Sequence, residues 1–184
     1  NEKLDGLLIR EKHRIRLYNH SHSAIKLETK KRNGTVIAKD STQIEINNAL
    51  DLVNGFCDPS AFDNELAKLI TIKLKSKVYK PRVIVEYDRQ AYYLPYGNIR
   101  ITFDKNLRTY NTHTNLFELN NIVKSPVLLN NNQILEVKFG EKLPSYLTDV
   151  LESVPSIRSS ISKYVLCQRF INHDPNKDYI IPTF

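Results

Sequence analysis

The stretch Arg14-Ile15-Arg16-Leu17, followed by Ile25-Lys26-Leu27-Glu28-Thr29-Lys30, alternates charged and apolar side chains. Successive side chains of a β-strand point to opposite faces, so this alternation predicts two strands with one charged face and one apolar face. Asn33-Gly34, a strong signal for a tight hairpin turn, comes next and predicts that residues 35–46 fold back as a third strand. The chain is therefore expected to begin as an antiparallel sheet.

The second half of the chain repeats this pattern. A segment rich in Val, Ile and Tyr at residues 83–94 predicts a strand, and Tyr96-Gly97-Asn98 turns it towards a partner at residues 99–105. Residues 126–129 and 133–139 predict a further hairpin, and the polar residues 108–125 predict a loop. Helices are expected at residues 47–54, 59–77, 144–153 and 159–170. Six or seven strands in hairpins with two or more helices give an α+β class.

The arrangement of the charges leaves two interpretations. A sheet with one solvated face explains simple alternation. However, Arg14 and Arg16 recur on one face about 6.5 Å apart, which costs roughly 2–3 kcal/mol of repulsion at an effective dielectric constant of 20. A solvated face does not need that repulsion, whereas an anion-binding face does. Glu28-Thr29-Lys30 and Glu136-Val137-Lys138 also place a carboxylate beside a lysine, as a site for phosphate and a divalent cation requires.

The second interpretation is a β-barrel whose charged faces point inward. Its interior would carry an excess of cations over acids. The cations would be Arg14, Arg16, Lys30, Lys39, Arg89, Arg100, Lys138 and Lys163, and the acids would be Glu28, Asp104 and Glu136. Such an interior is expected to hold a triphosphate or polyphosphate chain, and to be stabilised by it.

Composition agrees with an anionic partner. The chain has 184 residues and a net charge of +7, which favours phosphate, nucleic acid or an acidic surface. No apolar run approaches the roughly 18 residues of a transmembrane helix, so membrane association is expected only through a partner or another domain. Cys57 and Cys167 match no metal spacing and predict free thiols in a reducing, cytoplasmic compartment. The oligomeric state is left open.

Six segments in order resemble the VTC domain, the polyphosphate polymerase branch of the triphosphate tunnel metalloenzymes. Between them they extend over nearly the whole chain up to Phe170. They are Arg10-Glu11-Lys12-His13-Arg14-Ile15-Arg16-Leu17-Tyr18-Asn19, Ile25-Lys26-Leu27-Glu28, Val83-Ile84-Val85-Glu86-Tyr87-Asp88-Arg89, Gly97-Asn98-Ile99-Arg100-Ile101-Thr102-Phe103-Asp104, Ile134-Leu135-Glu136-Val137-Lys138 and Ser162-Lys163-Tyr164.

The resemblance implies a tunnel of about eight antiparallel strands with helices outside, a nucleoside triphosphate substrate such as ATP, and Mn²⁺ or Mg²⁺. Carried over, Lys163 is the expected catalytic residue and Glu136 the metal ligand. The residues expected to bind triphosphate or polyphosphate are Arg14, Arg16, Lys30, Lys39, Arg89, Arg100, Lys138 and Ser162. The domain is expected at residues 1–171, with a tail at 172–184. Family members begin with two further strands, so the tunnel is expected to be incomplete at its N-terminal side.

Three functions remain open from the sequence. The first is a polyphosphate polymerase that transfers a γ-phosphoryl group to a polyphosphate chain. The alternatives are a tunnel triphosphatase, which gives that group to water, and a non-catalytic polyanion-binding module. Nucleic acid is not expected as a partner, because the basic residues alternate on strands without the aromatic residues of a stacking platform.

Overall fold

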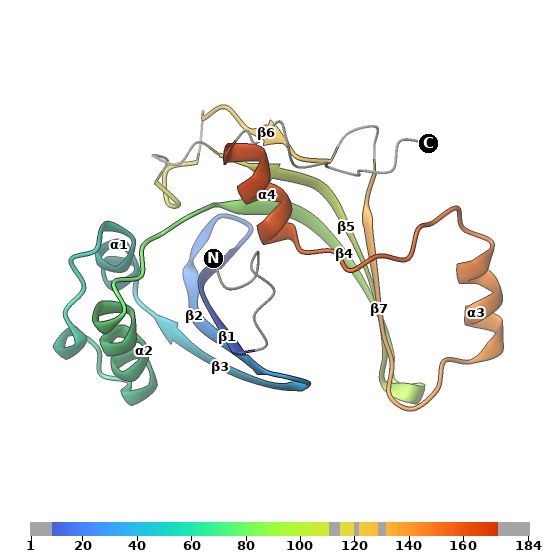
Figure 1. Ribbon diagram of the computed structural model, residues 1–184, viewed down its shortest axis with the longest axis horizontal. Coiled ribbons are helices and arrows are strands. Elements are labelled where there is room, and N and C mark those ends of the chain that lie inside the picture. Colours follow the sequence, from blue (N-terminus) through green and yellow to red (C-terminus); the bar gives the residue numbers. More distant parts are fainter. Residues whose placement is uncertain (1–8, 111–114, 120–121, 129–131, 173–184) are drawn as a thin grey trace. The chain divides into compact units, whose positions relative to one another are not determined.

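A computed structural model describes residues 9–110, 115–119, 122–128 and 132–172 of the chain (Figure 1). Its contacts divide the chain into two compact units, of which the first holds residues 1–81 and 115–119 and the second holds residues 82–114 and 120–184. Each unit contains one antiparallel sheet. The α+β class is confirmed. Within the described residues, however, the strand pairings give two open sheets and not a closed barrel.

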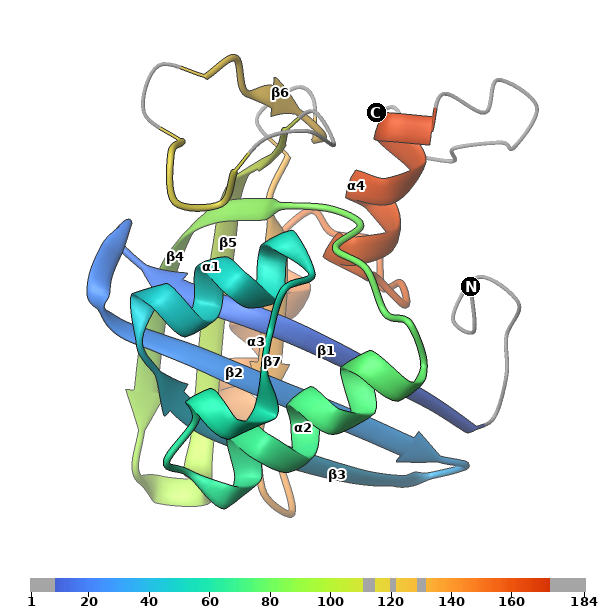
Figure 2. The same cartoon turned by 90° about the vertical axis from the view of Figure 1, so that its left-hand side faces the viewer.

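The first unit is a three-stranded sheet with two helices on one face. Its elements are β1 (Ile9–Tyr18), β2 (Ser21–Asn33), β3 (Val36–Ile44), α1 (Ile46–Asn54), the 3₁₀ turn η1 (Pro59–Ala61) and α2 (Glu65–Ser76). The strand order is β1-β2-β3. Both hairpins are as predicted, and Asn33 pairs with Val36 across the expected Asn-Gly turn. Figure 2 shows α1 and α2 lying across one face of this sheet.

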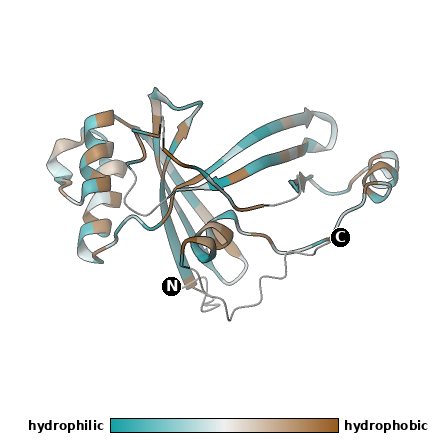
Figure 3. Cartoon of the chain, turned by 90° about the horizontal axis from the view of Figure 1, so that it is seen from above, coloured by the Kyte–Doolittle hydropathy of each residue, from teal (hydrophilic) through white to brown (hydrophobic). Residues whose placement is uncertain are grey.

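The core of the first unit fixes which strand face is buried. Ile25 and Leu27 of β2 are each 1% exposed and pack with Ala49 of α1 and with Ala67 and Ile70 of α2. Burial of these apolar side chains is the main favourable term for the unit. Since side chains alternate, Lys26, Glu28 and Lys30 must lie on the opposite face. Figure 3 shows hydrophilic and hydrophobic residues interspersed along the strands, as this alternation requires.

The helix predicted at residues 59–77 is divided in two. η1 ends at Ala61, and α2 starts only after Asn64, whose side-chain oxygen accepts a hydrogen bond from the backbone N–H of Ala67 at 3.2 Å. An Asn at this position satisfies one of the unpaired N–H groups of a helix start, so it begins a new helix. The helix predicted at residues 47–54 is confirmed, and Gly55 ends it with φ = 80°.

The second unit is a four-stranded sheet with helices after it. Its elements are β4 (Val85–Leu94), the 3₁₀ turn η2 (Tyr96–Asn98), β5 (Ile99–Thr109), β6 (Ser125–Pro126), β7 (Ile134–Lys138), α3 (Ser145–Glu152) and α4 (Lys163–Asn172). β5 pairs with β4 on one side and with both β6 and β7 on the other. The hairpin predicted between residues 126–129 and 133–139 is therefore wrong, because both segments pair with β5.

The extra length of β5 explains that difference. β5 continues to Thr109 through a bulge, where Asn106 has φ = 51°, and its last residues pair with β6 while its first residues pair with β7. Leu107, Val127, Ile134 and Cys167 form the buried core of this unit. Cys57 and Cys167 are both buried free thiols, as predicted.

Candidate functional site

The polar face of the first sheet carries a row of three lysines. Lys12 of β1 lies directly opposite Lys30 of β2, and Lys30 lies directly opposite Lys39 of β3. Directly opposed side chains on antiparallel strands share a face, with Cβ atoms about 4.5–5.5 Å apart. We call these residues the lysine row. Three ammonium groups on one face give that face a concentrated positive charge, so the row is a candidate anion site.

Lys12 was missed as a site residue in the sequence, although a signal was present. It precedes Arg14 and Arg16 by the same two-residue step, so strand alternation alone places it on their face. The structure extends β1 back to Ile9, which brings Lys12 into register with Lys30. Alternation along a strand does not fix which residues lie opposite each other, so the pairing of Lys12 with Lys30 needed the structure.

Glu28 contacts both arginines that are predicted to bind phosphate in the first unit. It lies opposite Arg14 in the register and forms an ion pair with the Nε of Arg14, and its Oε2 is 3.8 Å from the Nε of Arg16. The Arg16 guanidinium also donates to the Tyr18 hydroxyl at 3.2 Å. The expected repulsion between Arg14 and Arg16 is therefore reduced by a carboxylate that the repulsion argument left out.

In the second unit the predicted residues again share one face. Arg100 of β5 lies opposite Lys138 of β7, and Thr102 lies opposite Glu136. Across the other edge of β5, Asp104 lies opposite Arg89 of β4. All of these positions lie on the even-numbered face of β5. The strand residues expected to bind phosphate or metal in this unit are thus brought to one side of its sheet.

A buried carboxylate lies at the centre of this face. The side chain of Asp104 is fully buried and accepts hydrogen bonds from Nε and Nη2 of Arg89, at 2.6 and 2.8 Å. The Nζ of Lys163 lies 2.5 Å from Oδ2, the oxygen that also accepts from Nη2 of Arg89. Arg89 and Lys163 also lie over the Tyr87 ring, at 5.2 and 5.0 Å from its centroid. We call Tyr87, Arg89, Asp104 and Lys163 the Asp104 cluster.

The opposite charges within the Asp104 cluster stabilise each other's ionised forms. Burial alone raises the pKa of Asp104, but hydrogen bonds from Arg89 and Lys163 more than offset this, so its pKa lies below the ordinary value. The hydrogen bonds that Arg89 donates to Asp104 correspondingly raise the pKa of Arg89, against the effect of burial. The cluster therefore holds one anion and two cations, with a net positive charge. The sequence predicts Asp104 as one of the acids of a barrel interior, but it does not predict the direct contact of Asp104 with Lys163.

Lys163 and Ser162 stand at the beginning of α4. Lys163 is the first residue of the helix, and the Ser162 hydroxyl accepts from the backbone N–H of Val165 at 3.5 Å. A Ser in this position caps a helix start, which gives Ser162 a structural role beside the expected substrate contact. Figure 1 shows α4 beside β4 and β5, and Cys167 on its buried side lies 3.9 Å from the Arg108 carbonyl oxygen. Helix packing thus directs Lys163 towards Asp104.

Glu136 fits a metal site that relies mostly on other ligands. Its side chain is 42% exposed, and its Oε1 lies 3.2 Å from the Nζ of Lys138. Within the described residues, no group of three or more His, Cys, Asp or Glu side chains lies close enough to hold a metal. Mg²⁺ commonly binds to one or two carboxylates and completes its shell with water and substrate phosphate oxygens. Glu136 suits that arrangement, whereas an all-protein cage does not fit the described residues.

Two acids of β4, Glu86 and Asp88, are paired with residues outside the Asp104 cluster. Glu86 accepts from the Tyr110 hydroxyl and from Lys124, and the Arg108 guanidinium lies 2.6 Å from Glu86 and 3.0 Å from Asp88. Burial raises the pKa of Glu86, but these hydrogen bonds and charges lower it overall. Both acids are thus paired with other residues of the second unit.

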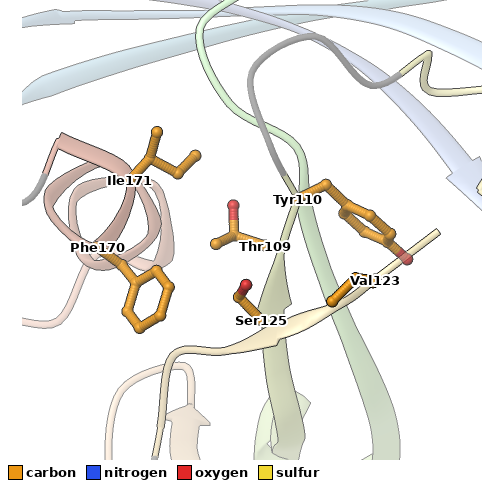
Figure 4. Close-up of a pocket in the computed structure, with 6 residues that line it drawn as sticks. All are labelled: Thr109, Tyr110, Val123, Ser125, Phe170 and Ile171. Atoms are coloured by element: carbon orange, nitrogen blue, oxygen red, sulfur yellow. The ribbon is translucent and has the colours of Figure 1, made fainter.

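A pocket lies at the other end of α4 (Figure 4). Its volume is about 350 Å³, and it is lined by Thr109, Tyr110, Val123, Ser125, Phe170 and Ile171. The Thr109 hydroxyl donates to the Ile84 carbonyl oxygen at 2.9 Å, and the Tyr110 hydroxyl donates to Glu86. These polar groups are engaged within the fold. None of the predicted site residues lines this pocket, so it is separate from the Asp104 cluster.

One of three comparisons with known proteins gives a match. The family model described as VTC domain matches residues 1–171. A search of the curated proteins gives no significant match, and neither does a search of the solved structures. No helix within the described residues is long and apolar enough to cross a membrane.

Proposed function

Because the chain belongs to the VTC domain family, we propose that it binds the phosphates of a nucleoside triphosphate and transfers the γ-phosphoryl group to a polyphosphate chain. At the level of the family, the VTC domain is associated with polyphosphate synthesis. The nucleotide substrate and the transfer step are parts of the proposal.

One observation carries the proposal. In each unit, the strand cations expected to bind phosphate lie on a single face of the sheet, as the strand register shows. In the first unit these are Arg14, Arg16, Lys30 and Lys39, and in the second unit they are Arg89, Arg100 and Lys138. A chain of phosphates needs cations in such repeated rows, because each phosphate adds a negative charge along the chain.

The residues would act mainly by positioning and charge neutralisation. Arg14 and Arg16 present planar guanidinium groups that can bind phosphate oxygens in pairs, and the lysine row supplies point charges. Lys163 would contact the transferred group and neutralise the charge that develops on its oxygens. Glu136 would hold a divalent cation, which when bound would supply positive charge that neutralises the phosphates. No covalent intermediate on the protein is required.

The test is product analysis after incubation of the chain with ATP and Mn²⁺ or Mg²⁺. Long polyphosphate is expected from the native chain, and none from Lys163→Ala. Lys142→Ala, which changes an exposed lysine, serves as the matched control and should keep full activity. Free orthophosphate as the sole product would establish the triphosphatase alternative. Tight polyphosphate binding without any product would establish the binding module.

A further inference from the structure

We infer that Asp104 is a positioning residue, which fixes Lys163 and Arg89 so that their remaining N–H donors face a common phosphate. The inference rests on the proposed function for the identity of the ligand. Its structural part concerns the Asp104 cluster alone, all of whose members belong to the second unit. It can therefore be tested separately from turnover.

The position of Lys163 creates the need for such a residue. Lys163 is the first residue of α4, and the N-terminus of a helix carries a partial positive charge. A cation is unfavourable there, and it tends to turn its side chain away from the helix end. The carboxylate of Asp104, 2.5 Å from the Lys163 Nζ, supplies the opposite charge that holds the amine over the sheet.

The burial of Asp104 shows that its contacts are obligatory. Its side chain is 0% exposed, while those of Lys163 and Arg89 are 20% and 31% exposed. A buried carboxylate is stable only when its oxygens are paired and hydrogen-bonded. Asp104 meets this condition through two hydrogen bonds from Arg89 and one contact with Lys163. The two cations therefore reach solvent, whereas the group that positions them does not.

The contact geometry leaves both cations able to bind a ligand. Arg89 uses its Nε and Nη2 for Asp104, so the terminal edge of the guanidinium, between Nη1 and Nη2, keeps N–H donors. The ammonium of Lys163 likewise has donors beyond the one directed at Asp104. The Tyr87 ring, about 5 Å from both, limits the rotation of both groups. An anion that meets these donors completes the cluster without displacing Asp104.

Removal of the carboxylate would change the cluster in a defined way. Asp104→Asn keeps the shape of the side chain but leaves two cations close together with no anion between them. The amide can accept a hydrogen bond from one of them through a single oxygen. Because Arg89 is held on a strand and Lys163 only by the helix start, Lys163 is expected to turn into solvent.

The experiment measures the rate at which acetic anhydride labels each lysine, read by peptide mass spectrometry. In the native chain, Lys163 should label several-fold more slowly than the exposed Lys142, since its amine is engaged with Asp104. In Asp104→Asn, Lys163 should label at least about fivefold faster than in the native chain. Asp88→Asn, which removes an acid of β4 that pairs with Arg108 and Asn106, is the matched control and should leave Lys163 unchanged.

Two results would overturn the inference. One is equal labelling of Lys163 in the native chain and in Asp104→Asn. The other is native labelling of Lys163 as fast as that of Lys142, which needs no variant and so decides the matter even if Asp104→Asn does not fold.

Turnover provides a second readout that a merely structural role would not give. Asp104→Asn should lower kcat about tenfold or more while changing KM for ATP much less, because other cations still bind the phosphates. Asp104→Glu should restore part of kcat. If the native chain shows no turnover, the proposed function fails, and labelling still decides the inference about Asp104.

Discussion

Glu28 lies directly opposite Arg14 across β1 and β2 and pairs with its guanidinium, while its carboxylate also approaches Arg16 to 3.8 Å. One carboxylate thus interacts with two guanidinium groups on the polar face of the first sheet. A carboxylate at this position should weaken the attraction of the face for anions and reduce the repulsion among its cations. The contacts of Glu28 therefore determine the direction of the changes in stability and affinity that we expect for Glu28 and Arg16 variants.

The first prediction concerns Glu28→Gln. Loss of the carboxylate should lower the stability of the empty protein by about 1 kcal/mol or less, because the pair is partly exposed. The same change should raise the affinity for tripolyphosphate and make it more sensitive to salt. Melting temperature and titration calorimetry at two salt concentrations measure both effects. Asp40→Asn, which removes the acid paired with Lys31 on the other face of the same hairpin, should leave affinity unchanged. Unaltered affinity in Glu28→Gln would place this face outside the binding site.

The second prediction concerns Arg16. Arg16→Lys should weaken tripolyphosphate binding by about 1–3 kcal/mol, because Lys cannot reproduce two parallel hydrogen bonds to phosphate. Repulsion alone predicts that Arg16→Ala stabilises the empty protein. With Glu28 between the arginines, we expect a stability change within about 0.5 kcal/mol instead. Calorimetry and thermal unfolding of both variants provide the measurements. Native affinity in Arg16→Lys would contradict a bidentate contact.

The third prediction uses two adjacent lysines that face opposite sides. Lys30→Ala removes the centre of the lysine row and should lower polyphosphate affinity several-fold, with a shallower dependence on salt. Lys31→Ala removes a lysine paired with Asp40 on the other face and should leave affinity unchanged. Lys12→Ala should resemble Lys30→Ala, since Lys12 belongs to the row. Equal effects from Lys30→Ala and Lys31→Ala would indicate a nonspecific charge effect.

The fourth prediction is a pH dependence of stability that comes from His13. Its side chain is 7% exposed, and its Nδ1 lies 2.9 Å from the Thr29 hydroxyl. Burial lowers the pKa of His13 below its ordinary value of 6.5, and the nearby Lys73, Lys77 and Lys31 act in the same direction, while Glu11 opposes them. The unfolded chain therefore binds a proton more readily, and stability should fall as the pH drops below about 6.5.

His13→Gln tests this assignment. Denaturant unfolding at pH 7.5 and pH 5 should show a loss of stability in the native chain, and a smaller loss in His13→Gln. His22→Gln, at an exposed position of β2, should behave like the native chain. An unchanged pH dependence in His13→Gln would mean that other groups cause it.

Local sequence pattern determined much of both sheets. The two-residue alternation around Arg14 and Arg16 placed the charged face correctly, because strand geometry fixes the side of every second residue. Asn33-Gly34 marked a turn through its backbone preferences. The sequence also predicted which cations of one strand share a face, since that depends only on the alternation of side chains.

Only the tertiary structure decided the contacts between distant segments. The pairing of both β6 and β7 with β5, and the register that brings Lys12 opposite Lys30, depend on strand length and bulges that no local pattern specifies. The meeting of Lys163 with Asp104 required α4 to pack on β4 and β5, which depends on the shape of the core around Cys167 and Leu107. The alternation of side chains along each strand determined which face of the sheet each residue lies on. Tertiary packing determined which groups on those faces are in contact.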